Sequence, residues 1–153
     1  MPSKTARIQD FPLCQEVTLE IFEERFMPRM QRFMSKSLSK KLSPSFIWSE
    51  IMSIIKGRIR SDGRVYQKFL SRREYSRFGS HWLEKKEKNT LYYIFLQYED
   101  WKLNVRAFDF LDVVSHVLLQ INNQTHYAWK YSHHAADFLI IDEVQDLYPK
   151  TIQ

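Results

Sequence analysis

Four apolar residues near the end of the chain run directly into a pair of carboxylates. Phe138–Ile141 are followed by Asp142 and Glu143, and then by Val-Gln-Asp. A short continuous apolar run predicts a strand buried on both faces, as in a parallel sheet. Acidic residues at the carboxyl end of such a strand lie where open α/β sheets bind ligands. Adjacent carboxylates there suit Mg-nucleotide hydrolysis, because one helps to hold the metal and the next polarises the attacking water.

Most of the remaining chain predicts helix. Glycine is scarce, with 3 residues in 153, and apolar side chains recur at helical spacing over long stretches. The clearest helix begins at Ser43 as the cap, has Pro44 in its first turn, and ends with Lys56 before Gly57. Ile47, Ile51, Ile54 and Ile55 would form its buried face. We therefore expect a mostly α-helical fold with a strand at Asp137–Asp142.

Three further helices are predicted by caps and spacing. Thr18 is the predicted cap of a helix towards Met30, and Pro28 would end or kink this helix. Within residues 80–104, apolar and aromatic side chains recur at helical spacing, and we assign this aromatic stripe to the core. Asp109 or a neighbour begins a last helix, and Asn122–Gln124 would end it in a turn. We expect Ser35–Lys41 to be a polar loop and residues 1–16 to be irregular.

A basic, aromatic-rich segment from Lys56 to Arg77 has two interpretations. Its arginines and lysines alternate with Tyr66, Phe69, Tyr75 and Phe78, as in a phosphate-contacting surface with stacking rings. The other interpretation is a short helix whose apolar residues face the core and whose charges face water. The net charge of +5 is compatible with nucleic-acid binding but does not require it. The candidate contacts to nucleic acid are Arg58, Arg60, Arg64, Arg72 and Arg73.

The sequence also bears on the location of the protein and on other kinds of site. Cys14 is the only cysteine, which favours a reducing, intracellular compartment. No apolar run approaches the ~20 residues of a membrane span, and the N-terminal residues do not form a secretory signal. Adjacent His133 and His134 point apart on a regular element and lack metal-site companions. Asp109 and Asp112 could be catalytic or metal-binding, but alone they look like helix-start residues.

The five residues Asp142–Asp146, directly after the apolar run, are far more specific than the Asp-Glu pair. They resemble motif II (Walker B) of superfamily 1 helicases of the UvrD/Rep type. Ala107–Val114 resembles the segment that precedes motif II in that family, where the chain returns from an inserted helical subdomain to the ATPase sheet. A closer resemblance is to the UvrD-like region of the large eukaryotic TPR and ankyrin repeat-containing helicase-like proteins. It extends over roughly residues 16 to 153, through the segments Glu16–Thr18, Phe46–Ile51, Ile55–Gly57 and Tyr98–Lys102.

This resemblance implies a role for each motif residue. Asp142 would help to hold the Mg²⁺ of bound ATP, and Glu143 would be the general base that orients the hydrolytic water. Gln145 would sense the γ-phosphate and couple hydrolysis to the nucleic-acid site. Asp146 would have a structural or coupling role. The competing interpretation is a buried strand that ends in a solvated acidic turn and has no nucleotide function.

The sequence departs from the family in one decisive respect. It contains no Gly-x-x-x-x-Gly-Lys-Ser/Thr loop to cradle phosphates. We therefore interpret the chain as an internal piece of a helicase, inactive alone, whose parent uses ATP, Mg²⁺, nucleic acid and the remainder of the helicase core. Its expected parts are an irregular segment (1–16), an insertion-like helical region (17–108) and the return to a RecA-like P-loop NTPase core (109–153). The alternative is a non-catalytic helical module that binds nucleic acid or protein.

Overall fold

The computed structural model describes residues 15–58 and 69–124. This part of the chain is mostly helical and contains two short parallel strands, which confirms the expected helical character. The strand predicted at Asp137–Asp142 and the whole of motif II lie outside the described residues. The expectation of a terminal strand in an ATPase core thus stays a prediction.

The first helical rod is formed by α1 (Leu19–Ile21), the π-helical η2 (Phe22–Phe26) and α2 (Met27–Gln31). Thr18 caps it as predicted, since its hydroxyl accepts a hydrogen bond from the Ile21 amide at 3.4 Å. Pro28 does not end the rod, because it lies in the first turn of α2 directly after the wider π turn. The widened turn accommodates a residue that has no N–H to donate.

The next segment contains one prediction that was wrong. Ser35–Lys41 is not a loop, because Ser35 caps the short helix α3 (Lys36–Lys41) by accepting from the Leu38 amide at 3.2 Å. The helix predicted from Ser43 is confirmed as α4 (Pro44–Ser49) and the π-helical η3 (Glu50–Lys56). Gly57 follows it, and a side chain there would press on the Met52 carbonyl.

Three more helices follow in the described chain. They are α5 (Arg72–Phe78), the long α6 (Lys85–Val105) and α7 (Phe110–Gln124). The aromatic stripe of α6 is buried as predicted, with Tyr98 fully buried and Trp101 8% exposed. Asn122–Gln124 remain within α7, so the turn predicted there was wrong.

The two strands bring the residues before α1 beside the residues that follow α6. β1 (Gln15–Glu16) pairs in parallel with β2 (Ala107–Phe108), and the Val17 amide extends the pairing to the Phe108 carbonyl at 2.7 Å. Residues 15 and 16 are therefore strand rather than irregular. Arg106 turns the chain from α6 into β2 with a left-handed backbone conformation (φ 55°).

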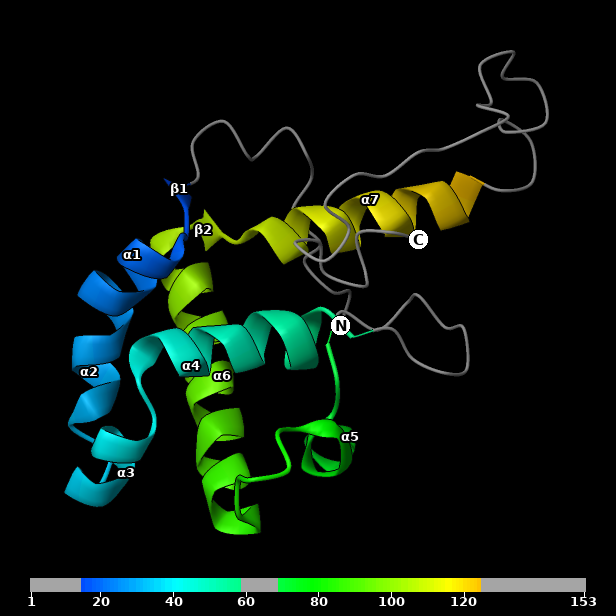
Figure 1. Cartoon of the computed structure of the whole chain (residues 1–153). Helices are drawn as coiled ribbons and strands as arrows, with labels where there is room; N and C mark the ends of the chain where they lie inside the picture. Colours follow the sequence, from blue (N-terminus) through cyan, green and yellow to red (C-terminus); the bar gives the residue numbers. More distant parts are fainter. Residues whose placement is uncertain (1–14, 59–68, 125–153) are drawn as a thin grey trace, which may run out of the picture.

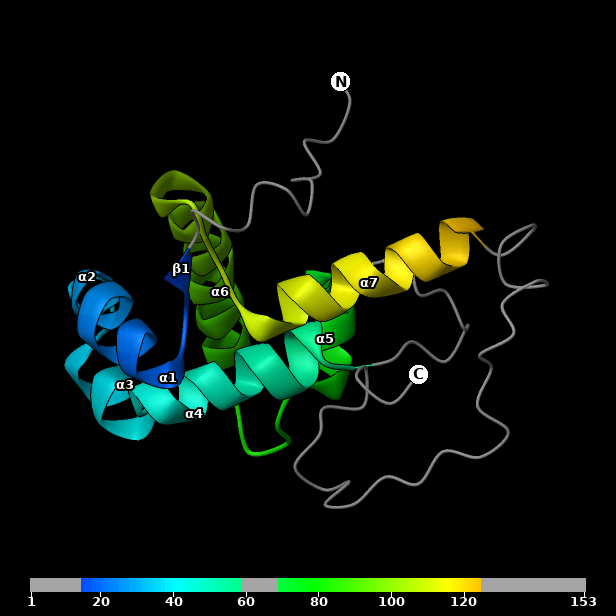
Figure 2. The ribbon, with the colours of Figure 1, turned by 90° about the horizontal axis from the view of Figure 1, so that it is seen from above.

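Helix α6 is the centre of the arrangement. The α1–η2–α2 rod lies along one side of α6, while α4–η3 crosses it and α5 packs against it (Figure 1). Viewed from above, α7 lies on the side of α6 away from α1–α3 (Figure 2). Ring contacts hold the centre together: Phe22 lies 5.4 Å from Tyr98, and Phe26 lies 5.5 Å from Trp101, between ring centroids.

Candidate functional site

The structure describes only part of the predicted site. Asp142, Glu143 and Gln145, together with Arg60 and Arg64, lie outside the described residues. Their predicted roles in Mg-ATP handling and nucleic-acid contact stay predictions. The remaining candidates, Arg58, Arg72 and Arg73, are described and are called the arginine surface below.

The arginine surface is assembled around α5. Arg58 comes from the chain after η3, and its guanidinium lies 4.1 Å from the ring centroid of Phe78 in α5. Arg72 opens α5 and lies 5.5 Å from the ring centroid of Tyr92 in α6. Arg73 is exposed beside it. Two of the three guanidiniums therefore rest on aromatic rings while their charges stay at the surface.

Helix α5 is fixed firmly to the rest of the fold. Its N-terminus has a capping box, in which Ser71 accepts from the Glu74 amide and Glu74 accepts from the Ser71 amide. On its inner face, the buried Tyr75 hydroxyl donates to Glu50 at 2.6 Å. The ammonium group of Lys88 donates to the Gly79 carbonyl at 2.9 Å, at the C-terminal end of the helix. The arginine surface thus has a rigid support.

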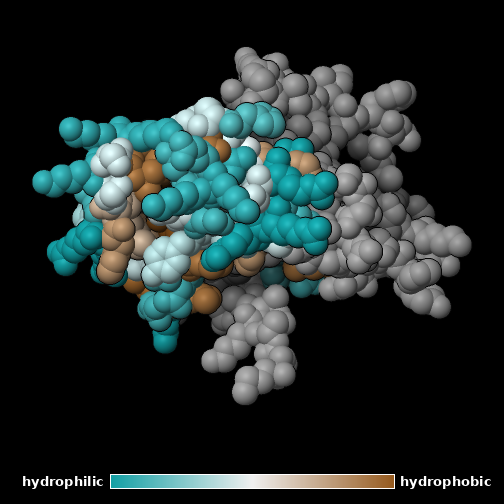
Figure 3. Space-filling view, turned by 90° about the horizontal axis from the view of Figure 1, so that it is seen from below, coloured by the Kyte–Doolittle hydropathy of each residue, from teal (hydrophilic) through white to brown (hydrophobic). Residues whose placement is uncertain are grey.

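Features of both interpretations of this segment occur together. Tyr75 is fully buried, and burial followed by the Glu50 carboxylate raises its pKa. Arg72, Arg73 and Arg77 are exposed on the same short helix. The described residues on the face shown in Figure 3 are largely hydrophilic, with hydrophobic residues among them. Charges facing water are therefore established for this helix, while contact with phosphates stays a prediction.

A buried cluster of charges lies where η3, α6 and the start of α7 meet. Its members are Lys56, Glu99, Lys102, Asp109 and Asp112. Both ammonium groups contact all three carboxylates, at 2.5 to 3.0 Å. The Lys56 side chain is 0% exposed and that of Asp109 is 1% exposed, so these charges are removed from water. We call these five residues the charge cluster.

The charge cluster controls protonation in its surroundings. Burial lowers the pKa of Lys56, but Asp109, Glu99 and Asp112 together raise it well above its usual range. The Tyr98 hydroxyl donates to Asp109 at 3.1 Å. Burial, and then the nearby carboxylates, raise the pKa of Tyr98. Both groups therefore keep their protons at neutral pH.

The charge cluster also ties α7 to the central helix. Asp109 and Asp112 accept from each other's backbone amides, each at 3.1 Å, so they form a reciprocal cap at the start of α7. This confirms their interpretation as helix-start residues. One carboxylate oxygen each of Glu99, Asp109 and Asp112 lie within 4.8 Å of one another, a spacing that suits a hard cation. The ammonium groups of Lys56 and Lys102 already contact all three carboxylates. The charge cluster is therefore an ion network that holds the helices together.

The sequence did not reveal the charge cluster. The sequence places Lys56 in the last turn of its helix, and it offers Lys102 only as part of the segment Tyr98–Lys102 in the family resemblance. The carboxylate partners of Lys56 lie 43 to 56 residues away from it in sequence. The available signal was the pair Asp109 and Asp112 at a predicted helix start, and it does not specify which positive charges meet them.

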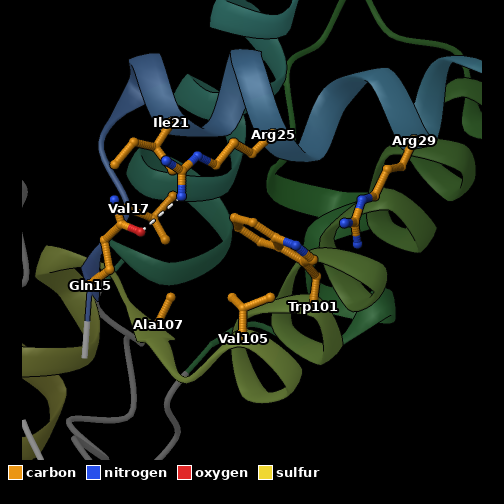
Figure 4. Close-up of a pocket in the computed structure, with 8 residues that line it drawn as sticks. All are labelled: Gln15, Val17, Ile21, Arg25, Arg29, Trp101, Val105 and Ala107. Atoms are coloured by element: carbon orange, nitrogen blue, oxygen red, sulfur yellow. Dashed lines mark hydrogen bonds between the residues drawn. The ribbon is translucent and has the colours of Figure 1, made fainter. Parts of the chain in front are cut away.

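One pocket lies between the α1–η2–α2 rod, the end of α6 and the strand pair. Its volume is about 320 Å³. We call it the tryptophan pocket; it is lined by Gln15, Val17, Ile21, Arg25, Arg29, Trp101, Val105 and Ala107 (Figure 4). None of these residues was a predicted site residue. Apolar side chains form most of its wall, and two arginines stand at its edge.

No protein-family model, curated protein or solved structure matches this chain. Within residues 15–58 and 69–124, no helix has the length and apolar character needed to cross a membrane.

Proposed function

We propose that this chain is the motif II-bearing part of a UvrD-like, ATP-dependent nucleic-acid helicase or translocase. The observation that carries the proposal is the run Asp142–Asp146 directly after the apolar residues Phe138–Ile141. In this function Asp142 helps to hold Mg²⁺, Glu143 is the general base and Gln145 senses the γ-phosphate. The phosphate-binding loop is absent from these 153 residues, so ATP hydrolysis requires sequence outside them.

The closure of the helical region is consistent with this proposal. The parallel pairing of β1 with β2 brings residues 15–16 next to residues 107–108. A helical region inserted into another domain needs its two ends close together. The segment Ala107–Val114, which resembles the return into the ATPase core, begins at this junction. An insertion at residues 17–108 is therefore compatible with the observed contacts.

The test of the ATPase proposal is a longer polypeptide that includes the neighbouring coding sequence and a phosphate-binding loop. In it, Glu143→Gln should abolish ATP hydrolysis and leave ATP binding intact, because the base is lost while the metal site remains. Glu23→Gln, at an exposed position in η2, is the matched control and should hydrolyse ATP normally.

Two outcomes would contradict this assignment. Hydrolysis retained by the Glu143→Gln protein would remove Glu143 from the role of base. A neighbouring sequence without any phosphate-binding loop within a few hundred residues would exclude an active ATPase of this class. For the 153-residue chain alone, ATP turnover should stay at background, and Glu143→Gln should change nothing.

A second candidate function is a non-catalytic module that binds single-stranded nucleic acid. The arginine surface favours it, because Arg58 and Arg72 are held in place on rings around a capped helix. Positively charged side chains that displace counterions from phosphates give binding that weakens steeply with salt. This function needs no phosphate-binding loop.

Binding of a fluorescein-labelled single-stranded oligonucleotide tests this second function. The double variant Arg72→Ala, Arg73→Ala should weaken binding and lower the slope of log affinity against log salt by about 1 to 2. Lys40→Ala, which removes an exposed charge from α3, should leave the slope nearly unchanged. Equal losses in both proteins would show that net charge, and not the arginine surface, controls binding. Absence of any binding at low salt would exclude the module function.

A further inference from the structure

The tryptophan pocket combines an apolar floor with hydrogen-bond donors that are not all used within the described residues. Val17, Ile21, Val105 and Ala107 surround an open space beside the indole of Trp101 (Figure 4). Its volume of about 320 Å³ lies at the small end of the range for ligand sites. That volume suits one or two amino-acid side chains and not a large cofactor.

Three groups at the pocket are hydrogen-bond donors. Arg25 donates from Nη1 to the Gln15 side-chain oxygen at 3.0 Å, and a guanidinium has further donors available. Within the described part of the chain, neither Arg25 nor Arg29 forms an ion pair with a carboxylate, and the indole N–H of Trp101 has no acceptor. In Figure 4 the Arg29 guanidinium lies on the side of the indole nitrogen, and Arg25 lies towards Gln15. The Arg29 end therefore suits an oxyanion.

The apolar floor of the tryptophan pocket favours some ligands that carry an oxyanion over others. A nucleobase on Val17, Ile21, Val105 and Ala107 would leave its ring nitrogens and carbonyl oxygens largely without partners, which is unfavourable on burial. An aliphatic or aromatic side chain has no such groups and gains free energy by leaving water. The small volume requires that the apolar group and the carboxylate be close together. The last residue of a polypeptide carries both on one Cα.

We propose that the tryptophan pocket binds the C-terminus of a polypeptide whose last residue is apolar. The terminal carboxylate lies at Arg29 and the indole N–H of Trp101, and the last side chain lies on the apolar floor. Arg25 closes the other end and adds positive charge. The pocket is open at the surface, so the preceding residues of the bound polypeptide can leave it. This mode is a side-chain version of C-terminal carboxylate capture. It depends on neither ATP hydrolysis nor nucleic-acid binding.

The test is an NMR titration of the full chain that follows the Trp101 indole N–H, assigned with the Trp101→Phe protein. The probe is the peptide Gly-Ser-Gly-Ser-Leu with a free carboxyl group. We expect a saturable shift of this signal, and binding about tenfold or more weaker for the same peptide ending in an amide. Arg29→Ala should weaken binding about tenfold or more, and Arg25→Ala less. Arg32→Ala removes an exposed arginine at the end of the same rod and should have no effect.

Several results would overturn the proposal. Equal binding of the acid and the amide, or unchanged binding by Arg29→Ala, would exclude carboxylate recognition. Binding of N-acetyl-leucine as tight as that of the pentapeptide would make the occupant a small free carboxylate. A larger response to thymidine 5′-monophosphate would identify a nucleotide site. No response to about 10 mM peptide would exclude the site, since that concentration exceeds a millimolar dissociation constant. The other indole signals report whether each variant remains folded.

Discussion

Lys56 and Arg58 are two residues apart, yet the charge of Lys56 is buried and that of Arg58 is exposed. Lys56 is fully buried in the charge cluster and contacts three carboxylates. Arg58 is exposed and rests on the ring of Phe78. The charge cluster sets the positions of helices, whereas the arginine surface keeps its charge available to a partner. The difference shows that basic residues in one segment need not share a function.

The physical reason is the free energy of removing a charge from water. A buried ammonium is tolerated only with opposite charges and hydrogen bonds around it. An exposed guanidinium keeps its hydration and needs only a surface for its planar face. The charge cluster should therefore affect stability, and the arginine surface should affect binding. The following predictions separate these two contributions, from the largest expected effect to the smallest.

Replacing Lys56 with methionine should lower the free energy of unfolding by about 3–5 kcal/mol, because the buried carboxylates lose one of two ammonium partners. Urea unfolding followed by circular dichroism measures this. Lys41→Met is the control, since Lys41 forms a surface ion pair with Glu87 at 2.6 Å and should cost about 0–1 kcal/mol. Equal effects of the two substitutions would contradict the assigned importance of the charge cluster.

Raising the pH should weaken the charge cluster without mutation, because Lys56 and Tyr98 lose their protons at high pH. The pKa values of Lys56 and Tyr98 are raised in the folded state by the nearby carboxylates, with burial the main cause for Tyr98. Their unfolded values are about 10.4 and about 10, so their contribution is complete below pH ~10. It is lost as the pH rises towards the folded-state values.

Urea midpoints between pH 8 and 11 check this pH dependence. They should fall above pH ~10, and less so in the Tyr98→Phe protein. Midpoints that rise over this interval would reverse the inferred sign.

Replacing Tyr75 with phenylalanine should lower the free energy of unfolding by about 1–3 kcal/mol, because buried Glu50 loses the hydroxyl that donates to it. Glu50 keeps its hydrogen bond from Ser80. Tyr93→Phe alters an exposed ring on α6 and should change stability little. A neutral Tyr75→Phe protein would mean that this hydrogen bond does not anchor α5.

Replacing Arg58 with alanine should have the smallest effect on stability, about 0.5–1 kcal/mol, through loss of its contact with Phe78. The same urea experiment measures it, with Arg73→Ala as a control that should lie within about 0.5 kcal/mol of the parent. A loss approaching that of Lys56→Met would mean that Arg58 is structural and would remove the contrast between the two regions.

Much of the helical fold was predictable because its signals are local. The Ser43 cap, Pro44 in the first turn and the isoleucine spacing act within one helix. The structure confirms the cap and the burial of Ile47, Ile51 and Ile55, while Ile54 is partly buried. The polar composition of Ser35–Lys41 predicts a loop, but the Ser35 cap begins a helix there. Pro28 predicts a helix end or a kink, and the structure excludes the end, because the π-helical η2 continues into α2 through Pro28. Motif II is equally local, and its proposed role rests on sequence alone.

The tertiary structure decided what the side chains do. Sequence periodicity placed Trp101 in the core, but only packing left its indole edge beside Arg29 in a pocket. Sequence placed Asp109 and Asp112 at a helix start, but only the crossing of η3 with α6 brought Lys56 to them, and the turn at Arg106 brought them back beside Lys102. Helix formation depends on residues three or four positions apart. The charge cluster and the tryptophan pocket instead depend on contacts between distant segments, for which local spacing carries no information.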